Sequence, residues 1–120
     1  MAESEFRHDC AFCRIAQGQQ EAEIVHQDDR VTAFRDIAPQ APTHIVVIPN
    51  RHIPSLEAAN EEDVALLGAM FLVAQQVARD EDLDRDGYRL VCNTGPDAGQ
   101  SVLHLHLHIL GGRRLGWPPG

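Results

Sequence analysis

The sequence predicts an α+β domain with a five-stranded antiparallel sheet, one long helix and a short N-terminal helix. Three observations lead to this prediction: five short segments rich in β-branched or alternating residues, one longer segment with helical periodicity, and strand connections that are mostly short. The 120 residues suit a single domain, which we expect to span residues 1–120 with a flexible N-terminus over about residues 1–9.

The N-terminal half is expected to contain one short helix and three strands. The stretch "CAFCRIAQG", from Cys10, predicts a helix that ends at Gly18. "AEIVHQ" around Val25 and "VTAFRD" from Val31 predict two strands, and "QDDR" between them predicts the turn of a hairpin. After the rigid loop "PQAP", the β-branched run "THIVVIP" from Thr43 predicts a buried strand.

The C-terminal half is expected to contain the long helix and two more strands. Asn60 is a good N-cap, Asp63 follows three residues later, and Gly87 ends the segment. We expect the helix to bury an apolar stripe made of Val64, Leu67, Phe71 and residues 74–78. "YRLVCN" from Tyr88 predicts the fourth strand, with Cys92 as a buried small hydrophobe, and "VLHLHLHIL", residues 102–110, predicts the fifth.

Composition excludes several classes of function. The formal net charge of −8 argues against a general nucleic-acid binder, which needs a basic surface. No apolar run approaches membrane-spanning length, and the charged start "MAESEFRHDC" lacks the apolar core of a signal peptide, so we expect a cytoplasmic protein without membrane association. All ten basic residues are arginine, which excludes Schiff-base chemistry and the lysine-bearing phosphate loop.

The most informative stretch is "HLHLHIL", which places His104, His106 and His108 at alternate positions. In a strand these three side chains share one face, and the aliphatic residues between them take the other. Neighbouring rings then start about 6.6 Å apart and the outer two about 13 Å apart, so we do not expect one metal held by all three. The rings should therefore divide between different tasks.

The stretch "CAFC" contains two cysteines that suggest a chemistry separate from that of the histidines. Cys10 and Cys13 form half of a site that suits zinc or redox chemistry. The redox interpretation needs a thioredoxin-like βαβ context, which the predicted elements do not supply. Cys92 makes the number of cysteines odd, which does not suggest a disulfide framework in a cytoplasmic chain.

Three motifs in the right order resemble the histidine triad (HIT) family. "GQSVLHLHLHILGG", from Gly99, is similar to the family signature, which is His-x-His-x-His followed by apolar residues. "DIAPQAPTHIVVIPNRHI", from Asp36, and the ending "WPPG" resemble the Hint branch of nucleoside phosphoramidases. The similarity covers the chain from about Cys10 to Gly120. It implies a HIT-like fold, a homodimer in which two five-stranded sheets join, and a nucleotide site in each subunit.

The resemblance implies four catalytic residues. His106, the middle histidine, matches the nucleophile that attacks phosphorus and becomes nucleotidylated. His108 matches a histidine that contacts the phosphate, Ser101 matches a serine that donates to a phosphate oxygen or the leaving group, and His44 matches a histidine that supports the site. This chemistry is reasonable because imidazole is a neutral nucleophile near neutral pH and nearby donors can stabilise the phosphate oxygens. No aspartate-rich magnesium motif is visible, so we expect no catalytic metal.

The resemblance also implies the contacts with the nucleotide. Asp36 matches the acid that binds both ribose hydroxyls, Asn93 matches a polar contact near the phosphate and ribose, and Gly99 matches a phosphate-loop glycine. Trp117 matches a tryptophan that borders the partner subunit's site. Four apolar residues match the slot around the base: Phe12, Ile15, Phe34 and Ile37.

Some relatives carry the cysteine pair together with two histidines as a structural zinc site. The matching histidines here are His52, in "PNRH", and His104, the first of the triad. A tetrahedral site made of Cys10, Cys13, His52 and His104 would leave no open position for a catalytic water, so the expected cofactor is a structural zinc. His104 would then serve zinc while His106 serves phosphate.

The functional hypothesis is a hydrolase that cuts the P–N bond of purine nucleoside 5′-monophosphoramidates through a nucleotidyl-histidine intermediate. A dinucleoside polyphosphate hydrolase is the alternative enzyme, but the short chain and the "WPPG" ending favour the phosphoramidase. A nucleotide-binding regulatory protein with residual activity is a different class, and the intact His106, His108 and Ser101 argue against it. A zinc-binding interaction module is a third class, supported only by "CAFC".

Overall fold

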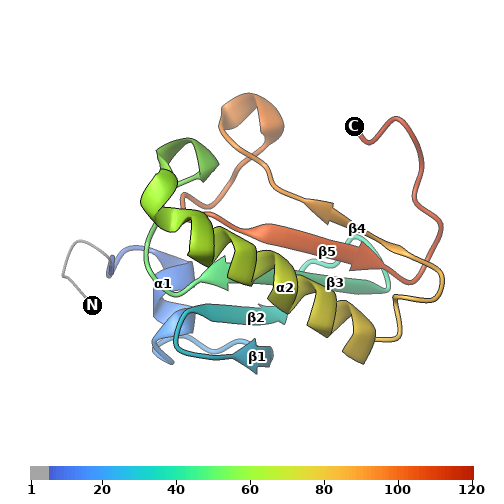
Figure 1. Cartoon of the computed structure of the whole chain (residues 1–120), viewed down its shortest axis with the longest axis horizontal. Coiled ribbons are helices and arrows are strands. Elements are labelled where there is room, and N and C mark those ends of the chain that lie inside the picture. Colours follow the sequence, from blue (N-terminus) through green and yellow to red (C-terminus); the bar gives the residue numbers. More distant parts are fainter. Residues whose placement is uncertain (1–5) are drawn as a thin grey trace.

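The computed structural model describes residues 6–120 and confirms the predicted α+β architecture (Figure 1). The helices are α1 (Ala11–Ala16) and α2 (Val64–Asp80), and the strands are β1 (Ile24–Gln27), β2 (Val31–Arg35), β3 (Thr43–Pro49), β4 (Tyr88–Val91) and β5 (Leu107–Gly111). The sheet is antiparallel, in the order β1-β2-β3-β5-β4. The N-terminus predicted to be flexible lies in part outside the described residues. Within residues 6–120, no helix combines the length and the apolar composition needed to cross a bilayer.

Strand β3 is the centre of the fold because both of its faces are covered. Ile45 and Val47 belong to the main core beneath α2, whereas Val46 and Ile48 pack with Ile15 of α1 in a second, smaller cluster. Successive side chains of a strand point to opposite faces, so a continuous β-branched run can serve both cores. Figure 1 shows α2 lying across the front of the sheet. The predicted buried strand from Thr43 is therefore confirmed.

The long helix starts with the predicted cap. The Asn60 side chain accepts a hydrogen bond from the Glu62 amide at 2.9 Å, and the Asp63 carboxylate accepts one from the Asn60 amide at 2.9 Å. This reciprocal capping box opens a 3-10 turn, Glu61–Asp63, which runs directly into α2. Similar short turns lie at Leu56–Ala58 and Pro96–Ala98.

The predicted apolar stripe of α2 is wrong in part, because Val64 is 65% exposed and Phe71 is 53% exposed. The buried positions are Met70, Val73, Ala74, Val77 and Ala78, which follow the spacing of a single helical face. Phe71 follows Met70 by one residue, so it is rotated by about 100° from that face. Leu67 is half-buried and packs against the main core, as predicted.

The fifth strand is shorter than predicted. It begins at Leu107, so His104 and His106 lie in the loop before it. The ladder with β3 ends where Val47 pairs with Leu107, and the Leu105 amide instead donates to the Ile53 carbonyl at 2.7 Å, outside the sheet. This bond turns the chain away from β3 and frees the first two histidines of the motif from the sheet.

The fourth strand also ends early, at Val91. Cys92 therefore lies just beyond it and is half-buried, packing against the main core. Burial raises the pKa of its thiol. The predicted role of Cys92 as a small hydrophobe agrees with this position.

Candidate functional site

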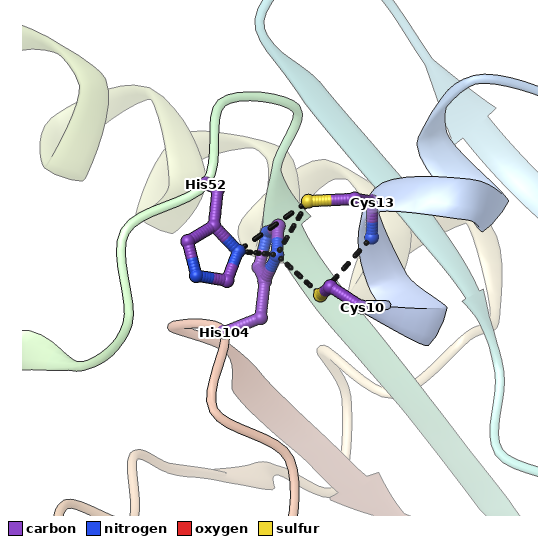
Figure 2. Close-up of side chains that lie close together, drawn as sticks. All are labelled: Cys10, Cys13, His52 and His104. Carbon is purple, nitrogen blue, oxygen red and sulfur yellow. Dashed lines mark hydrogen bonds between the residues drawn. The ribbon is translucent and has the colours of Figure 1, made fainter. Parts of the chain in front are cut away.

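The loop before β5 sends its histidines in two directions. His104 lies against Cys10, Cys13 and His52 (Figure 2), whereas His106 lies beside His108 with their ring centroids 4.9 Å apart. The predicted common strand is wrong, but the rings separate into two groups as their spacing predicts. We call Cys10, Cys13, His52 and His104 the Cys–His cluster.

Figure 2 shows Cys10 and Cys13, at the start of α1, converging with His52 and His104 from two other segments. The Cys10 Sγ atom lies 3.3 Å from Nδ1 of His104, and the Cys13 Sγ atom lies 3.4 Å from Nδ1 of His52. The two Nδ1 atoms are 3.3 Å apart, and Cys13 Sγ is 3.6 Å from Nδ1 of His104. Ligand atoms around a tetrahedral zinc with ordinary bond lengths lie about 3.3–3.8 Å from one another. The donor set and its spacing therefore fit zinc.

The protonation pattern of the cluster also suits a metal. The Nε2 atom of His104 donates to the Pro49 carbonyl at 2.8 Å, so the lone pair is on Nδ1, which faces the sulfurs. The ring is fully buried, which lowers its pKa to about 4. Burial raises the pKa of the Cys13 thiol to about 11, while the amides of Arg7 and Cys13 donate to the sulfurs of Cys13 and Cys10, each at 3.4 Å. The Arg7 amide lowers the pKa of Cys13 less than burial raises it, so the thiol keeps its proton until a bound metal displaces it.

A cavity of about 320 Å³ is lined by His106 and His108, and we call it the histidine pocket. Most of the predicted catalytic and nucleotide-binding residues line it: Phe12, Ile15, Phe34, Asp36, Ile37, Ser101, His106 and His108. Phe12 and Phe34 meet edge to face, with ring centroids 5.3 Å apart, and form an apolar wall. Ile37 is 99% exposed, so it is at the rim, where a planar ligand could cover it.

Among residues 6–120, the hydrogen bonding of His106 leaves one ring nitrogen free. Nδ1 donates to the backbone carbonyl of His104 at 2.7 Å, so Nε2 carries the lone pair. Burial lowers the pKa of His106, which keeps the ring neutral near neutral pH. Phe12 packs edge to face against the ring, with centroids 5.1 Å apart. A neutral, oriented imidazole with a free nitrogen can attack an electrophilic phosphorus in this cavity.

His44, His108 and Asp36 form a chain of polar contacts along one wall. The Gln40 amide donates to Nδ1 of His44 at 3.0 Å, so Nε2 of that ring carries the proton. This Nε2 lies 2.8 Å from Nδ1 of His108 and 3.4 Å from a carboxylate oxygen of Asp36. The Nδ1 of His108 is therefore the acceptor, and its own proton is on Nε2, ready to donate to a phosphate oxygen. Burial, with His106 and His44 adding to it, lowers the pKa of His108 to about 4.

Asp36, His44 and His108 also lie close enough together to hold a metal ion. The hydrogen bonds of His44 argue against that use, because its Nδ1 faces an N–H donor and its Nε2 holds the proton. One oxygen of Asp36 accepts from the Ala38 amide at 2.8 Å, which leaves the other beside His44. The arrangement therefore fits a hydrogen-bonded relay better than a metal site.

The remaining predicted residues lie outside the histidine pocket. Asn93 follows β4, and Gly99 ends the Pro96–Ala98 turn with a φ of +79°, a conformation that favours glycine. Trp117 is 82% exposed, and its predicted contact concerns a second subunit. Seven lining residues were missed by the sequence analysis: Ala11, Gln20, Glu21, Ala22, Arg35, Val46 and Val102. Of these, Val46 lies on the same face of β3 as His44, so strand alternation could have identified it.

A second cavity, of about 490 Å³, adjoins the histidine pocket and was not anticipated from the sequence. We call it the N-terminal cavity. It shares Ala11, Ser101 and Val102 with the histidine pocket and is otherwise lined by Arg7, Asp9, Cys10, His52, Pro54 and Leu103. No motif indicated it, because its charged residues precede α1 in a segment without sequence periodicity.

Comparison with known proteins gives a consistent result. The model of the HIT domain family matches residues 17–115. An uncharacterized HIT-like protein of Synechococcus elongatus is 52% identical over 112 residues, which cover 93% of this chain and 97% of that protein. An uncharacterized HIT-like protein of a Synechocystis species is 50% identical over the same shares of the two chains.

Solved structures agree with the sequence matches. The crystal structure of a HIT family hydrolase from Legionella pneumophila has a TM-score of 0.92 at 48% identity, covering 93% of this chain and all of that one. A histidine triad protein from Clostridium difficile has a TM-score of 0.89 at 41% identity, covering 92% of this chain and 96% of that one.

Proposed function

This chain belongs to the HIT domain family, and from that membership we propose that it is a hydrolase of the Hint type, cutting the P–N bond of purine nucleoside 5′-monophosphoramidates. The observation that carries the proposal is the position of His106, whose free Nε2 lines the same cavity as Asp36 and Ser101. A nucleophile, a ribose-binding acid and a hydroxyl donor around one cavity are what nucleotidyl transfer to histidine requires.

The proposed reaction has two steps, each of which breaks one bond to phosphorus. His106 Nε2 attacks phosphorus, the P–N bond breaks, and the leaving nitrogen takes up a proton from solvent and departs as the amine. Water then attacks phosphorus and gives up a proton to solvent, and the P–Nε2 bond breaks to release the nucleoside monophosphate. Nε2–H of His108 and the hydroxyl of Ser101 would donate to the phosphate oxygens, where negative charge increases in each transition state.

The other end of the histidine pocket suits the nucleoside. One carboxylate oxygen of Asp36 lies 3.4 Å from Nε2 of His44. Because this contact is long, two ribose hydroxyls could replace it. Phe12, Ile15, Phe34 and Ile37 supply apolar surface of the kind that stacks against a base. Asn93 and Gly99 are proposed to contact the phosphate and ribose, although in this subunit alone they lie beyond the pocket lining.

We further propose that the Cys–His cluster holds one structural zinc. The four ligands are all protein atoms, so the ion would supply no open coordination position and would act by cross-linking. It would join the start of α1 to the loop after β3 and to the loop before β5, and the first and last of these segments contribute residues to the lining of the histidine pocket. Within residues 6–120, Cys10, Cys13 and Cys92 form no disulfide, which supports a reducing cytoplasmic location.

A homodimer is the proposed assembly, with the whole chain forming one domain in each subunit. Strand β4 is an edge strand, so a second sheet can pair with it. Val64, Phe71 and Leu72 leave apolar side chains exposed on α2. The exposed Trp117 would then border the partner subunit's site.

The decisive experiment is an assay of the 5′-phosphoramidates of adenosine, guanosine and cytidine with purified protein. We expect release of the monophosphate, faster for the purines, and a nucleotidylated His106 trapped by rapid denaturation at alkaline pH, where the P–N bond to histidine is stable. Hydrolysis of a dinucleoside polyphosphate without hydrolysis of the amides would favour the alternative enzyme. Tight nucleotide binding without turnover would instead favour a regulatory protein.

A further inference from the structure

The loop that carries Ser101 is organised around one side chain, that of Gln100. Its Oε1 atom accepts from the Gly95 amide at 3.0 Å. Its Nε2 atom donates to the Val102 carbonyl at 3.0 Å and to the Pro54 carbonyl at 2.9 Å. These partners fix the orientation of the amide, because an oxygen must face the N–H and a nitrogen must face the two carbonyls. Both N–H groups of Gln100 are therefore in use, and the side chain has no donor left for a substrate.

The bonds of Gln100 hold the residues on both sides of Ser101. The Gln100 amide also donates to the Gly95 carbonyl at 3.1 Å, so two hydrogen bonds join these residues. The residue after the serine, Val102, is held by Nε2 of Gln100. Ser101 itself is exposed while it lines the histidine pocket, so packing does not hold its side chain. The position of its hydroxyl therefore depends on the backbone that Gln100 holds.

The bond to Pro54 ties this loop to the segment that also positions the nucleophile. The preceding carbonyl, of Ile53, accepts from the Leu105 amide at 2.7 Å, and Leu105 directly precedes His106. Two consecutive carbonyls thus hold the residue before the nucleophile and the residue before the serine. The segment follows β3 and also carries His52 of the Cys–His cluster (Figure 2). The distance between the nucleophile and the hydroxyl donor therefore depends on one short, anchored stretch of backbone.

We propose that Gln100 is a positioning residue, which holds the hydroxyl of Ser101 at a fixed distance from His106 during the transfer. This inference rests on the proposed phosphoramidase function and adds a residue to which the sequence motifs assign no role. Because Gln100 has no free donor, its loss should lower kcat through Ser101 rather than through a lost substrate contact. Asp36 and the apolar wall of the histidine pocket belong to other segments, so KM should change little.

Gln100→Glu is the most informative substitution, because it keeps the shape of the side chain and an acceptor for the Gly95 amide. Its second oxygen would face two carbonyls, which raise the pKa of the carboxyl above its ordinary value of about 4.3. When protonated, that carboxyl has one O–H and can again donate to Pro54. At about pH 8 we expect kcat to be about tenfold below wild type, and at about pH 5 to return to within about threefold. The comparison with wild type at each pH cancels the titrations that both proteins share.

Two further variants identify the cause of the loss. Gln100→Met has a similar length but no polar group, so its kcat should stay below wild type by the same factor at every pH. Gln76→Glu introduces the same charge on an exposed position of α2 and should keep the wild-type kcat. A role of Gln100 in packing alone predicts no recovery of Gln100→Glu at low pH. Melting temperature and zinc content are recorded for each variant, so that a damaged fold is detected directly.

A double-mutant cycle tests whether Gln100 acts through Ser101. Ser101→Ala should lower kcat by itself, because it removes the hydroxyl. Adding Gln100→Glu to that variant should then lower kcat by less than about threefold more, since no hydroxyl remains to be positioned. Two independent effects would multiply instead.

The outcomes separate this inference from the proposed function. Suppose that wild type hydrolyses adenosine 5′-phosphoramidate. A wild-type kcat in Gln100→Glu at about pH 8, a loss that is equal at every pH, or a loss that multiplies with that of Ser101→Ala would then reject the positioning role and leave the phosphoramidase standing. A wild-type protein that hydrolyses none of the nucleoside phosphoramidates would reject the proposed function and the positioning role together.

Discussion

His104 and His106 are two residues apart in the chain, yet their rings expose opposite nitrogens. Each ring donates one N–H to a backbone carbonyl: His104 uses Nε2 towards Pro49, and His106 uses Nδ1 towards His104. The free lone pair is therefore on Nδ1 of His104 and on Nε2 of His106. The backbone carbonyl that accepts from each ring thus determines which nitrogen keeps the lone pair, and so which chemistry the histidine can perform.

The two nitrogens differ in where they can act. Nδ1 is close to the backbone, so His104 contributes to a compact, buried cluster whose ligands come from three segments of the chain. Nε2 is at the far end of the ring, so His106 can present its lone pair to the cavity in which a substrate fits. The difference teaches that the histidine motif combines a structural site and a reactive site, and that losing each should have a different consequence.

The largest effect is expected from His106→Ala, which should lower kcat by at least about a thousandfold because it removes the nucleophile. Nucleotide binding should stay within about tenfold, and the melting temperature should barely change, since the Cys–His cluster is untouched. His26→Ala, which removes an imidazole from β1, is the matched control and should retain full activity. Wild-type turnover in His106→Ala would disprove the mechanism.

The opposite result is expected from Cys13→Ala, which removes a ligand of the Cys–His cluster. About one zinc per chain should be lost, and the melting temperature should fall by about 10 °C or more, because metal binding contributes to folding stability. The loss of kcat at a temperature where the variant is folded should be smaller. Elemental analysis, thermal melts and initial rates give the three readings.

Cys92→Ala is the matched control, because it removes a half-buried thiol outside the cluster. It should keep its zinc and lose at most about 1 kcal/mol of stability. Stoichiometric zinc in Cys13→Ala would show that the ligand set is wrong. A collapse of kcat with unchanged stability would mean that the metal belongs to the chemistry, and the division between His104 and His106 would not hold.

Asp36→Asn is expected to lower only the affinity for the nucleotide. The amide oxygen can still accept from the Ala38 amide, so the loop should keep its shape while the charge is lost. Affinity for a nucleoside monophosphate should fall by about 10- to 100-fold, the value of a charge-assisted contact of about 1.5–3 kcal/mol. Calorimetry with ribose and 2′,3′-dideoxyribose ligands makes the test, and an equal loss for both would contradict the ribose contact.

The sequence predicted the elements of this fold well, because local patterns determine them. The β-branched run of β3 and the Asn60 cap need only neighbouring residues to be recognised. The start of β5 could not be predicted, because the Leu105 amide is taken by Ile53, more than fifty residues away in the chain. The exposure of Val64 and Phe71 depends on the sheet that α2 crosses, which the helical pattern alone does not contain.

The candidate site was predictable in its composition but not in its protonation. The alternating histidines separated into two groups as expected, but the cause is the bond from the Leu105 amide to the Ile53 carbonyl rather than the spacing along a common strand. Which nitrogen each ring exposes depends on the carbonyls of Pro49 and His104 and on the amide of Gln40. Such long-range and backbone contacts leave no sequence signal, and the same is true of the N-terminal cavity.

The smallest effect in this comparison is expected at His44, which we propose acts through His108 as a positioning residue. His44 donates from Nε2 to Nδ1 of His108 and so places the proton of His108 on the nitrogen that would face a phosphate oxygen. His44→Ala should lower kcat by about tenfold with little change in KM, because the donor would act mainly on the transition state. His44→Gln keeps an N–H near the position of Nε2 and should recover part of that loss, whereas a purely structural role would not distinguish a donor from any side chain of similar size.

¹⁵N chemical shifts of the His108 ring report the tautomer directly: wild type and His44→Gln should show the proton on Nε2, and His44→Ala should show a mixture. Equal losses of kcat in the two variants with an unchanged tautomer would remove His44 from the relay and leave His108 oriented by other contacts in the histidine pocket.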